Sequence, residues 1–354
     1  MLSVTVPYWG QSIFRVVGVL LAVLLPAGTF VYVYLFKMVS FMQSRLGPME
    51  AGPYGSMQLL AEVGKFLQKE DIIPERADRR IFAMAPIIVM VSTFVLFIVV
   101  PFGPDAVFHG GPQGITAGVF LALALSSISV LGILMAGWAS SNKYSLMGGL
   151  RAAGQLIAYE LPMVLSVLGV VIQAETLDMQ GIVVKQNSGS IFGIDWLGNP
   201  YILTQFVAFV IFMIAVQAEL TQNPFDMPVA ESELVAGYMT EYSGFRFLTF
   251  FIAEFATAGA FCAIASTLFL GGWGLPYSWF GWSADSIGSV GNWMNVVGPL
   301  ILFGKMMALG FVIFWVRFTY PRFREDQLQK FAWKVLIPLS LANIAVTAIL
   351  KVVF

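Results

Sequence analysis

The run IFAMAPIIVMVSTFVLFIVVP at residues 81–101 decides the fold, because it holds no charged residue and is long enough to cross a bilayer as a helix. Further apolar runs of similar length follow along the chain. Together they predict eight spans, at about 14–36, 81–101, 115–138, 155–174, 201–220, 247–271, 296–317 and 332–353. We therefore predict an all-α polytopic membrane protein with about eight transmembrane helices, forming one integral-membrane domain over residues 1–354.

The composition supports this fold class. Of the 354 residues, 58% are apolar and 11% are charged, whereas a soluble domain carries about 25% charged residues. The single cysteine, Cys262, excludes an intramolecular disulfide, a cysteine-based zinc site and an iron–sulfur cluster within this chain. The single histidine, His109, is expected to be a solvated loop residue, and a bis-histidine haem is excluded.

The cationic residues divide unevenly between the two sides of the predicted spans. One side receives 15 of the 19 Lys and Arg residues and the other receives 3, while Lys305 falls inside the seventh span. Since cytoplasmic connections carry the excess of Lys and Arg, we expect both termini to lie outside. The connections 37–80, 139–154, 221–246 and 318–331 are then cytoplasmic.

A surface helix is predicted in the first cytoplasmic connection, over residues 56–70. Its sequence SMQLLAEVGKFLQKE places Leu59, Val63 and Phe66 on one face at helical spacing. Lys65 and Lys69 fall mostly on the other face. This pattern is typical of an amphipathic helix that lies at the membrane interface.

The cytoplasmic connection 221–246 is acidic and is the candidate functional segment. Ala218–Gly244 has no Lys or Arg and carries five carboxylates, which are Glu219, Asp226, Glu231, Glu233 and Glu241. One interpretation is a solvated loop whose acids stabilise a helix N-terminus. The many apolar residues between the acids favour another interpretation, because carboxylates in apolar surroundings have raised pKa values and exchange protons near neutral pH.

Two further acids lie inside predicted spans, Glu160 in the fourth and Glu254 in the sixth. Neither has a Lys or Arg one helical turn away, and an unpaired acid within a membrane is costly. Each of them is either a polar group bonded to a neighbouring helix or part of a proton path that includes the loop acids.

Arg45 stands where the first apolar helix meets a turn rich in Gly and Pro. It is either a cytoplasmic anchor or a polar group at the mouth of an apolar tunnel that admits a lipophilic ligand. The chain has no GxGxxG or Walker A sequence, no metal-ligand spacing and no nucleophile–base pair. We therefore expect no bound redox cofactor, no metal and no catalytic residue in this chain, whose acids must serve a process that another protein drives.

Four motifs follow one another in the order known from one family: QSRLGPMEAGPYGSMQLLAEVGKFLQKE at 43–70, GWASSNKYSLMGGLRAAGQLIAYELPM at 137–163, PFDMPVAESELVAGYMTEYSG at 224–244 and FFIAEF at 250–255. Together they resemble the NuoH family, a membrane subunit of bacterial respiratory complex I that is homologous to mitochondrial subunit 1 of NADH:ubiquinone oxidoreductase. The resemblance runs from about Val31 to Val353.

This resemblance implies eight transmembrane helices and an enzyme subunit without independent activity, which forms the quinone tunnel and starts a proton-coupling chain of acids. It implies quinone as the substrate, with NADH, FMN and iron–sulfur clusters bound by partner subunits. The implied partners are a hydrophilic redox arm on the cytoplasmic side, antiporter-like membrane subunits laterally, and membrane lipid, with no nucleic acid. The implied location is the bacterial inner membrane.

The resemblance also assigns residues. The implied proton relay consists of Glu160, Glu219, Glu231, Glu233, Glu241 and Glu254, and the implied quinone site consists of Lys37, Arg45, Gln58, Glu62, Phe225 and Asp226. The chain departs from the family pattern near the quinone entrance. Leu35 and Phe36 stand where Glu and Arg are usual, Gln222 replaces an Arg, Val229 replaces a Glu, and Glu62 replaces an Asp.

Three alternatives stay open at this point. A homologous anchor of a membrane-bound hydrogenase, or of another donor-specific complex, would keep the fold and change the electron donor. A stand-alone cation or proton transporter would show broken helices in symmetric halves, and the sequence gives no such pattern. A purely structural anchor would carry these acids without a proton role.

Overall fold

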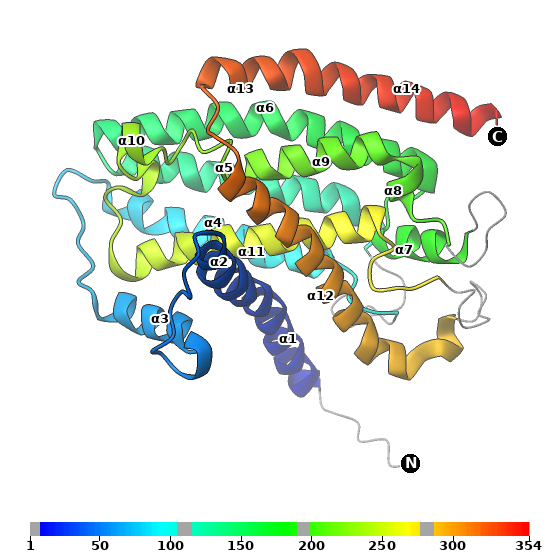
Figure 1. Cartoon of the computed structure of the whole chain (residues 1–354), viewed down its shortest axis with the longest axis horizontal. Coiled ribbons are helices and arrows are strands. Elements are labelled where there is room, and N and C mark those ends of the chain that lie inside the picture. Colours follow the sequence, from blue (N-terminus) through cyan, green and yellow to red (C-terminus); the bar gives the residue numbers. More distant parts are fainter. Residues whose placement is uncertain (1–7, 105–114, 190–197, 277–286, 354) are drawn as a thin grey trace.

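The structure is a computed structural model that describes residues 8–104, 115–189, 198–276 and 287–353, without the side chains of 8–16, 19, 231, 232 and 287–293. His109 lies outside these residues. Within them every regular element is a helix, which confirms the all-α fold class (Figure 1).

Among the described residues, seven helical segments are long and apolar enough to cross a membrane, which confirms a polytopic membrane protein. They are Leu20–Met42, formed by the end of α1 (Tyr8–Thr29), a π-helical turn (Phe30–Met38) and α2 (Val39–Met42); α4 (Arg79–Val99); α5 (Gly118–Ala139); α6 (Lys143–Ala174); α11 (Gly244–Phe269); Met294–Thr319 of α12 (Ile287–Thr319); and Glu325–Val353, which joins α13 (Glu325–Phe331) to α14 (Ile337–Val353).

The fifth predicted span, 201–220, is divided in two. A short helix α8 (Tyr201–Thr204) is followed at Gln205 by a break with φ −117° and ψ 37°, and then by α9 (Phe206–Glu219), which has 14 residues. The Gln205 side chain donates to Thr347 Oγ1 at 2.9 Å and accepts from Asn343 Nδ2 at 2.9 Å. Polar partners on α14 therefore hold the break, and one of the eight predicted spans is a short apolar helix.

Helix α6 begins earlier than the apolar pattern predicts. The connection 139–154 is mostly helical, because α6 starts at Lys143. Asn142 caps it, with its side-chain oxygen accepting from the Tyr144 N–H at 2.9 Å, as an N-cap residue does. The extension places Arg151 on a rigid helix beside the acidic connection.

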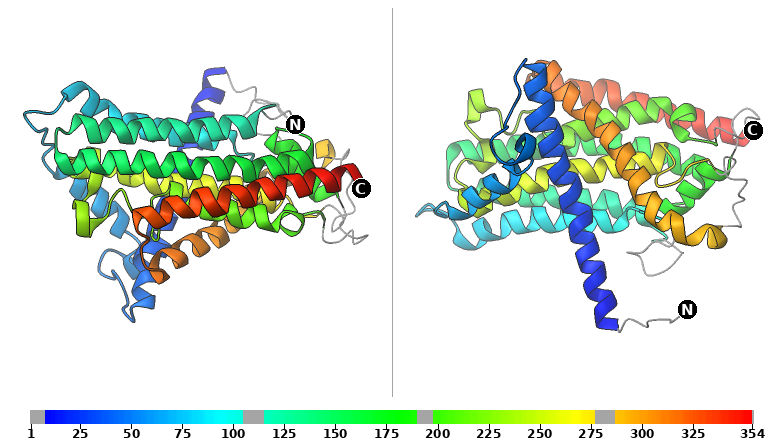
Figure 2. Two further views of the ribbon diagram at one scale, coloured as in Figure 1. Left: turned by 90° about the horizontal axis from the view of Figure 1, so that it is seen from above. Right: turned by 60° about the horizontal axis from the view of Figure 1, so that its bottom comes forward.

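Helices α5, α6, α9, α11 and α14 run side by side, while α1 and α12 cross them at a steep angle (Figures 1 and 2). Helix α11 is central, since most of its residues are buried, whereas most of the segment formed by α13 and α14 is exposed. It packs on α4, α12 and α1, and α6 packs on α5, α9 and α14. The apolar side chains left exposed on α14 suit contact with lipid.

Helix α3 (Gln58–Gln68) falls within the predicted surface helix 56–70. It adjoins the first span, because a Cβ atom on Gly28 would lie 3.2 Å from the Leu59 side chain. Leu60 and Leu67 stay exposed, as a membrane-facing side would be. The interfacial position of this helix stays a prediction. A further short helix, α7 (Met179–Ser188), lies beyond α6.

The acidic connection 221–246, which contains α10 (Glu231–Leu234), packs against α6 through α10 and residues 237–239. A Cβ atom on Gly148 of α6 would come 2.6 Å from the Tyr238 backbone nitrogen. Gly237 has φ +55°, and a Cβ atom there would come 1.9 Å from the Pro228 carbonyl oxygen. Glycine at these two positions allows the close approach of the backbones, and this approach fixes where the acids of the connection lie.

Candidate functional site

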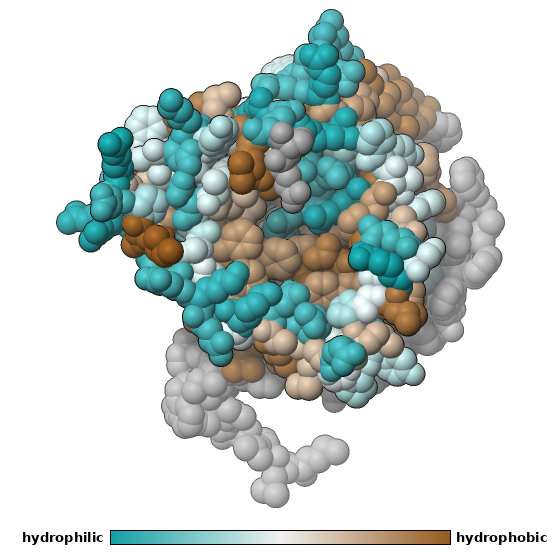
Figure 3. All heavy atoms as spheres, turned by 60° about the vertical axis from the view of Figure 1, so that its left-hand side comes forward, coloured by the Kyte–Doolittle hydropathy of each residue, from teal (hydrophilic) through white to brown (hydrophobic). Residues whose placement is uncertain are grey.

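The end of the bundle that carries α3 and α10 is hollowed. Figure 3 shows an apolar floor there, surrounded by hydrophilic residues. The acidic connection enters the protein at this end. Gln155, fully buried on α6, donates to the carbonyl oxygens of Ala218 and Phe225, each at 2.7 Å. Residues 218–225 therefore fold back against α6.

Three carboxylates lie in or near this turn, on three different helices. Glu160 of α6 accepts a hydrogen bond from Ser127 Oγ of α5, and it repels Glu219 at the end of α9 electrostatically. Glu254 of α11 accepts a hydrogen bond from Gln222 Nε2 of the acidic connection. The predicted span acids thus both have polar partners on neighbouring elements, and Glu160 lies near enough to Glu219 for their charges to interact.

Several buried polar atoms near these acids have no hydrogen-bond partner among the described residues. They are Gln155 Oε1, Glu219 Oε2, Gln222 Oε1 and Arg317 Nη1. Arg317 of α12 attracts Glu254 electrostatically, and Asp226 repels it. Buried polar atoms in proteins are ordinarily paired with protein or with ordered water. These atoms therefore leave hydrogen-bonding capacity unused beside the carboxylates.

Tyr238 covers the same region from the acidic connection. Burial raises its pKa, and the charges of Glu254 and Asp226 raise it further. The phenol group therefore keeps its proton at neutral pH.

Glu241 lies apart from Glu160, Glu219 and Glu254. Glu241 accepts a hydrogen bond from Asn142 Nδ2, next to the start of α6. The side chain of Glu231 lies outside the described residues. Sequence reasoning grouped these acids with Glu160 and Glu254, whereas the Asn142 contact places Glu241 at the start of α6, away from them.

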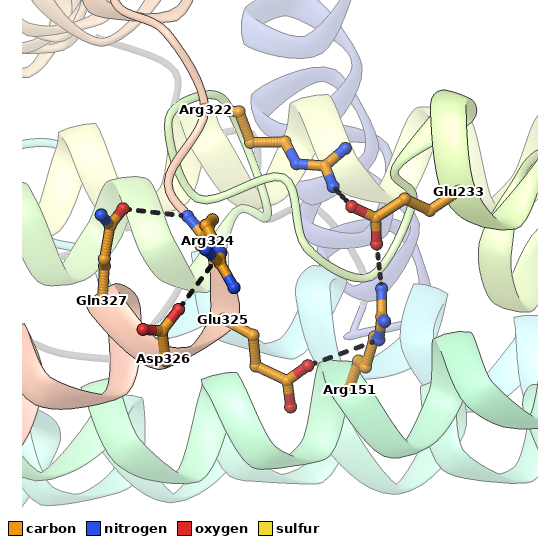
Figure 4. A network of polar contacts seen from close by, with 7 residues as sticks. All are labelled: Arg151, Glu233, Arg322, Arg324, Glu325, Asp326 and Gln327. Carbon is orange, nitrogen blue, oxygen red and sulfur yellow. Dashed lines mark hydrogen bonds and ion pairs between the residues drawn. The ribbon is translucent and has the colours of Figure 1, made fainter.

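Glu233 forms a network of ion pairs instead (Figure 4). One carboxylate oxygen accepts from Arg151 Nη1 at 2.6 Å and the other accepts from Arg322 Nη2, and Arg151 also lies 3.7 Å from Glu325. The hydrogen bond from Arg151 lowers the pKa of Glu233, and the charges of Arg322 and Arg151 lower it further. For Glu233 this is opposite to the raised pKa that its apolar sequence neighbours predict.

The predicted quinone residues fall into two separate groups. Arg45 is exposed and lines a cavity of about 480 Å³ together with Leu35, Phe36, Val39, Ser40, Leu46, Gly47 and Pro48. Lys37 donates to the Pro48 carbonyl oxygen at 2.8 Å and lines a second cavity of about 410 Å³ between the first span and α12. On α3, Gln58 donates to Glu62 at 3.2 Å.

The other group lies inside the acidic connection. Phe225 is buried, with its ring 5.2 Å from that of Tyr159 and 5.5 Å from that of Phe323. Asp226 lies near enough to Glu254 to repel it electrostatically, and near enough to Tyr238 for its charge to raise the pKa of that phenol. This second group therefore belongs to the surroundings of the interior acids, whereas the first belongs to the first span and α3.

Sequence reasoning missed the cations that meet the acids. In the sequence, Arg151, Arg317 and Arg322 were only counted among the Lys and Arg residues that indicate the orientation of the chain. One signal in the sequence would have found Arg322: the acidic stretch Ala218–Gly244, which has no Lys or Arg, and the basic connection at 318–331 are both predicted on the same side. Opposite charges held on one side of a membrane are candidates for pairing.

These observations define a class: a polytopic α-helical membrane protein with partly buried carboxylates next to an acidic connection. Among the described residues, no group of three or more His, Cys, Asp or Glu side chains is placed to hold a metal ion.

Comparison with known proteins gives the family. The NADH dehydrogenase family model matches residues 14–348. The NuoH subunit of NADH-quinone oxidoreductase from Geobacillus kaustophilus is 43% identical over 351 residues, which cover 98% of this chain and 97% of that protein. The same subunit from Brevibacillus brevis is 42% identical over 345 residues, covering 97% and 95%. The chain therefore belongs to the NuoH family of NADH-quinone oxidoreductases, a family of enzyme subunits, which confirms the resemblance drawn from its motifs.

Proposed function

We propose that this chain forms the quinone-binding tunnel of a proton-pumping NADH:quinone oxidoreductase and begins its proton-coupling relay. The observation that carries the proposal is the set of three partly buried carboxylates, Glu160, Glu219 and Glu254, on three helices next to the acidic connection. Acids are costly at such a depth and are usually retained for a function.

The chemistry of quinone explains why a relay is needed. A quinone takes up two electrons and two protons to become a quinol, and the electrons come from redox groups in partner subunits. In the proposed relay, Glu254 and Gln222 lie at the acidic connection, and Glu219 and Glu160 lead toward α5 and α6. The unpaired atoms of Gln155, Gln222 and Glu219 would be bridged by water.

The quinone head group would approach the first span. Arg45 and Lys37 line two cavities there, and most of the other lining side chains are apolar, which suits an isoprenoid tail. Gln58 and Glu62 on α3, and Phe225 and Asp226 in the acidic connection, would complete the site. Glu241 and Glu231 would supply protons at the mouth of the relay.

The partners follow from the same proposal. A hydrophilic redox arm would dock at the cytoplasmic end, antiporter-like subunits would lie laterally, and lipid of the bacterial inner membrane would cover the rest. Relatives named as NADH-quinone oxidoreductase subunits favour this function over a hydrogenase anchor. The names of these relatives also favour the proposed function over that of a stand-alone transporter.

The orientation of the chain gives one testable prediction. Single cysteines at Ser56 and Ser141, both exposed, in a Cys262→Ala background should react only with reagents that reach the cytoplasm. The physical reason is the excess of Lys and Arg on their side. Labelling of intact cells with an impermeant maleimide measures it, and a cysteine at Ser188, exposed on α7, is the opposite control. Labelling at Ser56 in intact cells would overturn the orientation.

The quinone site gives a second prediction. Arg45→Ala removes the exposed cation of the 480 Å³ cavity. We expect the KM for quinone to rise by about fivefold, which corresponds to about 1 kcal/mol of lost head-group interaction. Electron transfer to a soluble artificial acceptor should be unchanged, because that reaction bypasses the membrane site. A parallel fall of both activities with loss of assembled complex would make Arg45 an anchor.

A further inference from the structure

Glu233 meets two arginines that come from distant parts of the chain. Arg151 belongs to α6, and Arg322 lies in the connection between α12 and α13. Figure 4 shows the two guanidinium groups approaching the Glu233 carboxylate from different directions, each bonded to a different oxygen. We call Arg151, Glu233 and Arg322 the arginine clamp.

The clamp is partly shielded from solvent. The side chains of Arg151 and Arg322 are 22% and 26% exposed, while that of Glu233 is 48% exposed. Isolated surface pairs contribute little, but here two cations share one carboxylate, and Arg151 also faces Glu325 at 3.7 Å. The geometry therefore joins α6, the acidic connection and the start of α13 at one point.

The clamp lies between two other anchors of the acidic connection. Gln155 holds its beginning, and Tyr242 holds its end by donating to the Phe82 carbonyl oxygen at 3.1 Å. Arg322 follows the end of α12, whose last turn carries Arg317. The clamp therefore fixes the end of α12 relative to the connection that brings Gln222 to Glu254.

A carboxylate held between two guanidinium groups is a poor proton carrier. The arginines stay charged at all physiological pH values, and they hold the pKa of Glu233 below its usual range. Glu233 would therefore remain ionised in every turnover, unlike an acid that takes up and releases a proton.

We propose that Arg151 and Arg322 are positioning residues that hold the acidic connection in place by clamping Glu233, which acts as a fixed anion and not as a member of the proton relay. This inference rests on the proposed function, because its main readout is quinone reduction. Phe225 and Asp226, proposed at the quinone site, lie on the connection that the clamp holds.

The test is a mutant cycle in assembled complex. Arg151→Gln and Arg322→Gln each leave one pair intact, so the quinone KM should rise about twofold. Glu233→Gln removes both pairs, as does the double arginine variant, and both should raise KM by about fivefold. Combining all three changes should add nothing further. Arg324→Gln is the matched control, because Arg324 is 83% exposed and pairs with its neighbour Asp326 at 3.5 Å.

The expected pattern is a rise in KM that exceeds any fall in kcat, with Glu233→Gln equal to the double arginine variant. A severe loss of kcat in Glu233→Gln alone, with both arginine variants normal, would overturn the clamp and restore Glu233 to the relay. Hydrogen exchange of residues 237–242 gives a readout independent of activity. Faster exchange in Glu233→Gln and in the double arginine variant supports the clamp, and exchange equal to that of Arg324→Gln refutes it. If the unaltered complex reduces no quinone, the proposed function fails before any variant is compared.

Discussion

Glu160→Gln should lower coupled quinone reductase activity by at least about tenfold while the complex stays assembled. The amide keeps the shape of the side chain and still bonds to Ser127, so packing between α5 and α6 is preserved. It cannot bind and release a proton. Loss of this step would break the proposed relay next to Glu219, the acid whose charge interacts with that of Glu160.

Glu160→Asp is the matched control for this prediction. Aspartate keeps the ionisable group and loses one methylene, so we expect it to retain part of the activity. Both variants should be compared in membranes that hold equal amounts of complex, by quinone reduction and by proton pumping. Equal and near-normal values for Gln and Asp would make Glu160 a polar packing residue of α6, without a role in proton transfer.

The spans could be predicted from the sequence because their signal is local. A run such as 81–101 contains its own apolar residues, and α4 at Arg79–Val99 follows it closely. The prediction of a span fails where residues distant in the sequence determine whether the helix continues. Gln205 breaks the run 201–220 because Asn343 and Thr347 on α14 bind its amide. Neither partner is visible in the run itself.

In the candidate site, too, some features can be predicted from the sequence and others cannot. Acids within apolar spans, such as Glu160 and Glu254, stand out in the sequence because a charge there is unusual. The pairing of Glu233 with Arg322 joins residues that are 89 positions apart, so no spacing rule finds it. The close contact between the backbones of Gly237 and Gly148 of α6 cannot be predicted either, because a glycine in a sequence does not reveal which backbone it contacts.

Lys305 gives the last prediction, for stability. Its Nζ donates to the carbonyl oxygens of Leu270, Gly272 and Gly274 at 2.7, 2.8 and 2.8 Å. All three donors of the ammonium group are thus satisfied, and its charge faces the carboxyl end of α11, where a cation is favourable. The lysine therefore ties α12 to the chain that follows α11.

Lys305→Met keeps the length of the side chain and leaves three carbonyl groups without their donor. We expect a loss of about 3 kcal/mol in the free energy of unfolding, since each unpaired buried carbonyl costs about 1 kcal/mol or more. Thermal unfolding of the detergent-purified complex measures the loss. Lys351→Met is the control, because Lys351 is 44% exposed and pairs with Glu175 at 3.1 Å on the surface, where a pair contributes about 0–1 kcal/mol. Equal unfolding temperatures for the two variants would show that Lys305 contributes no more than a surface lysine, and that packing alone holds α12 against α11.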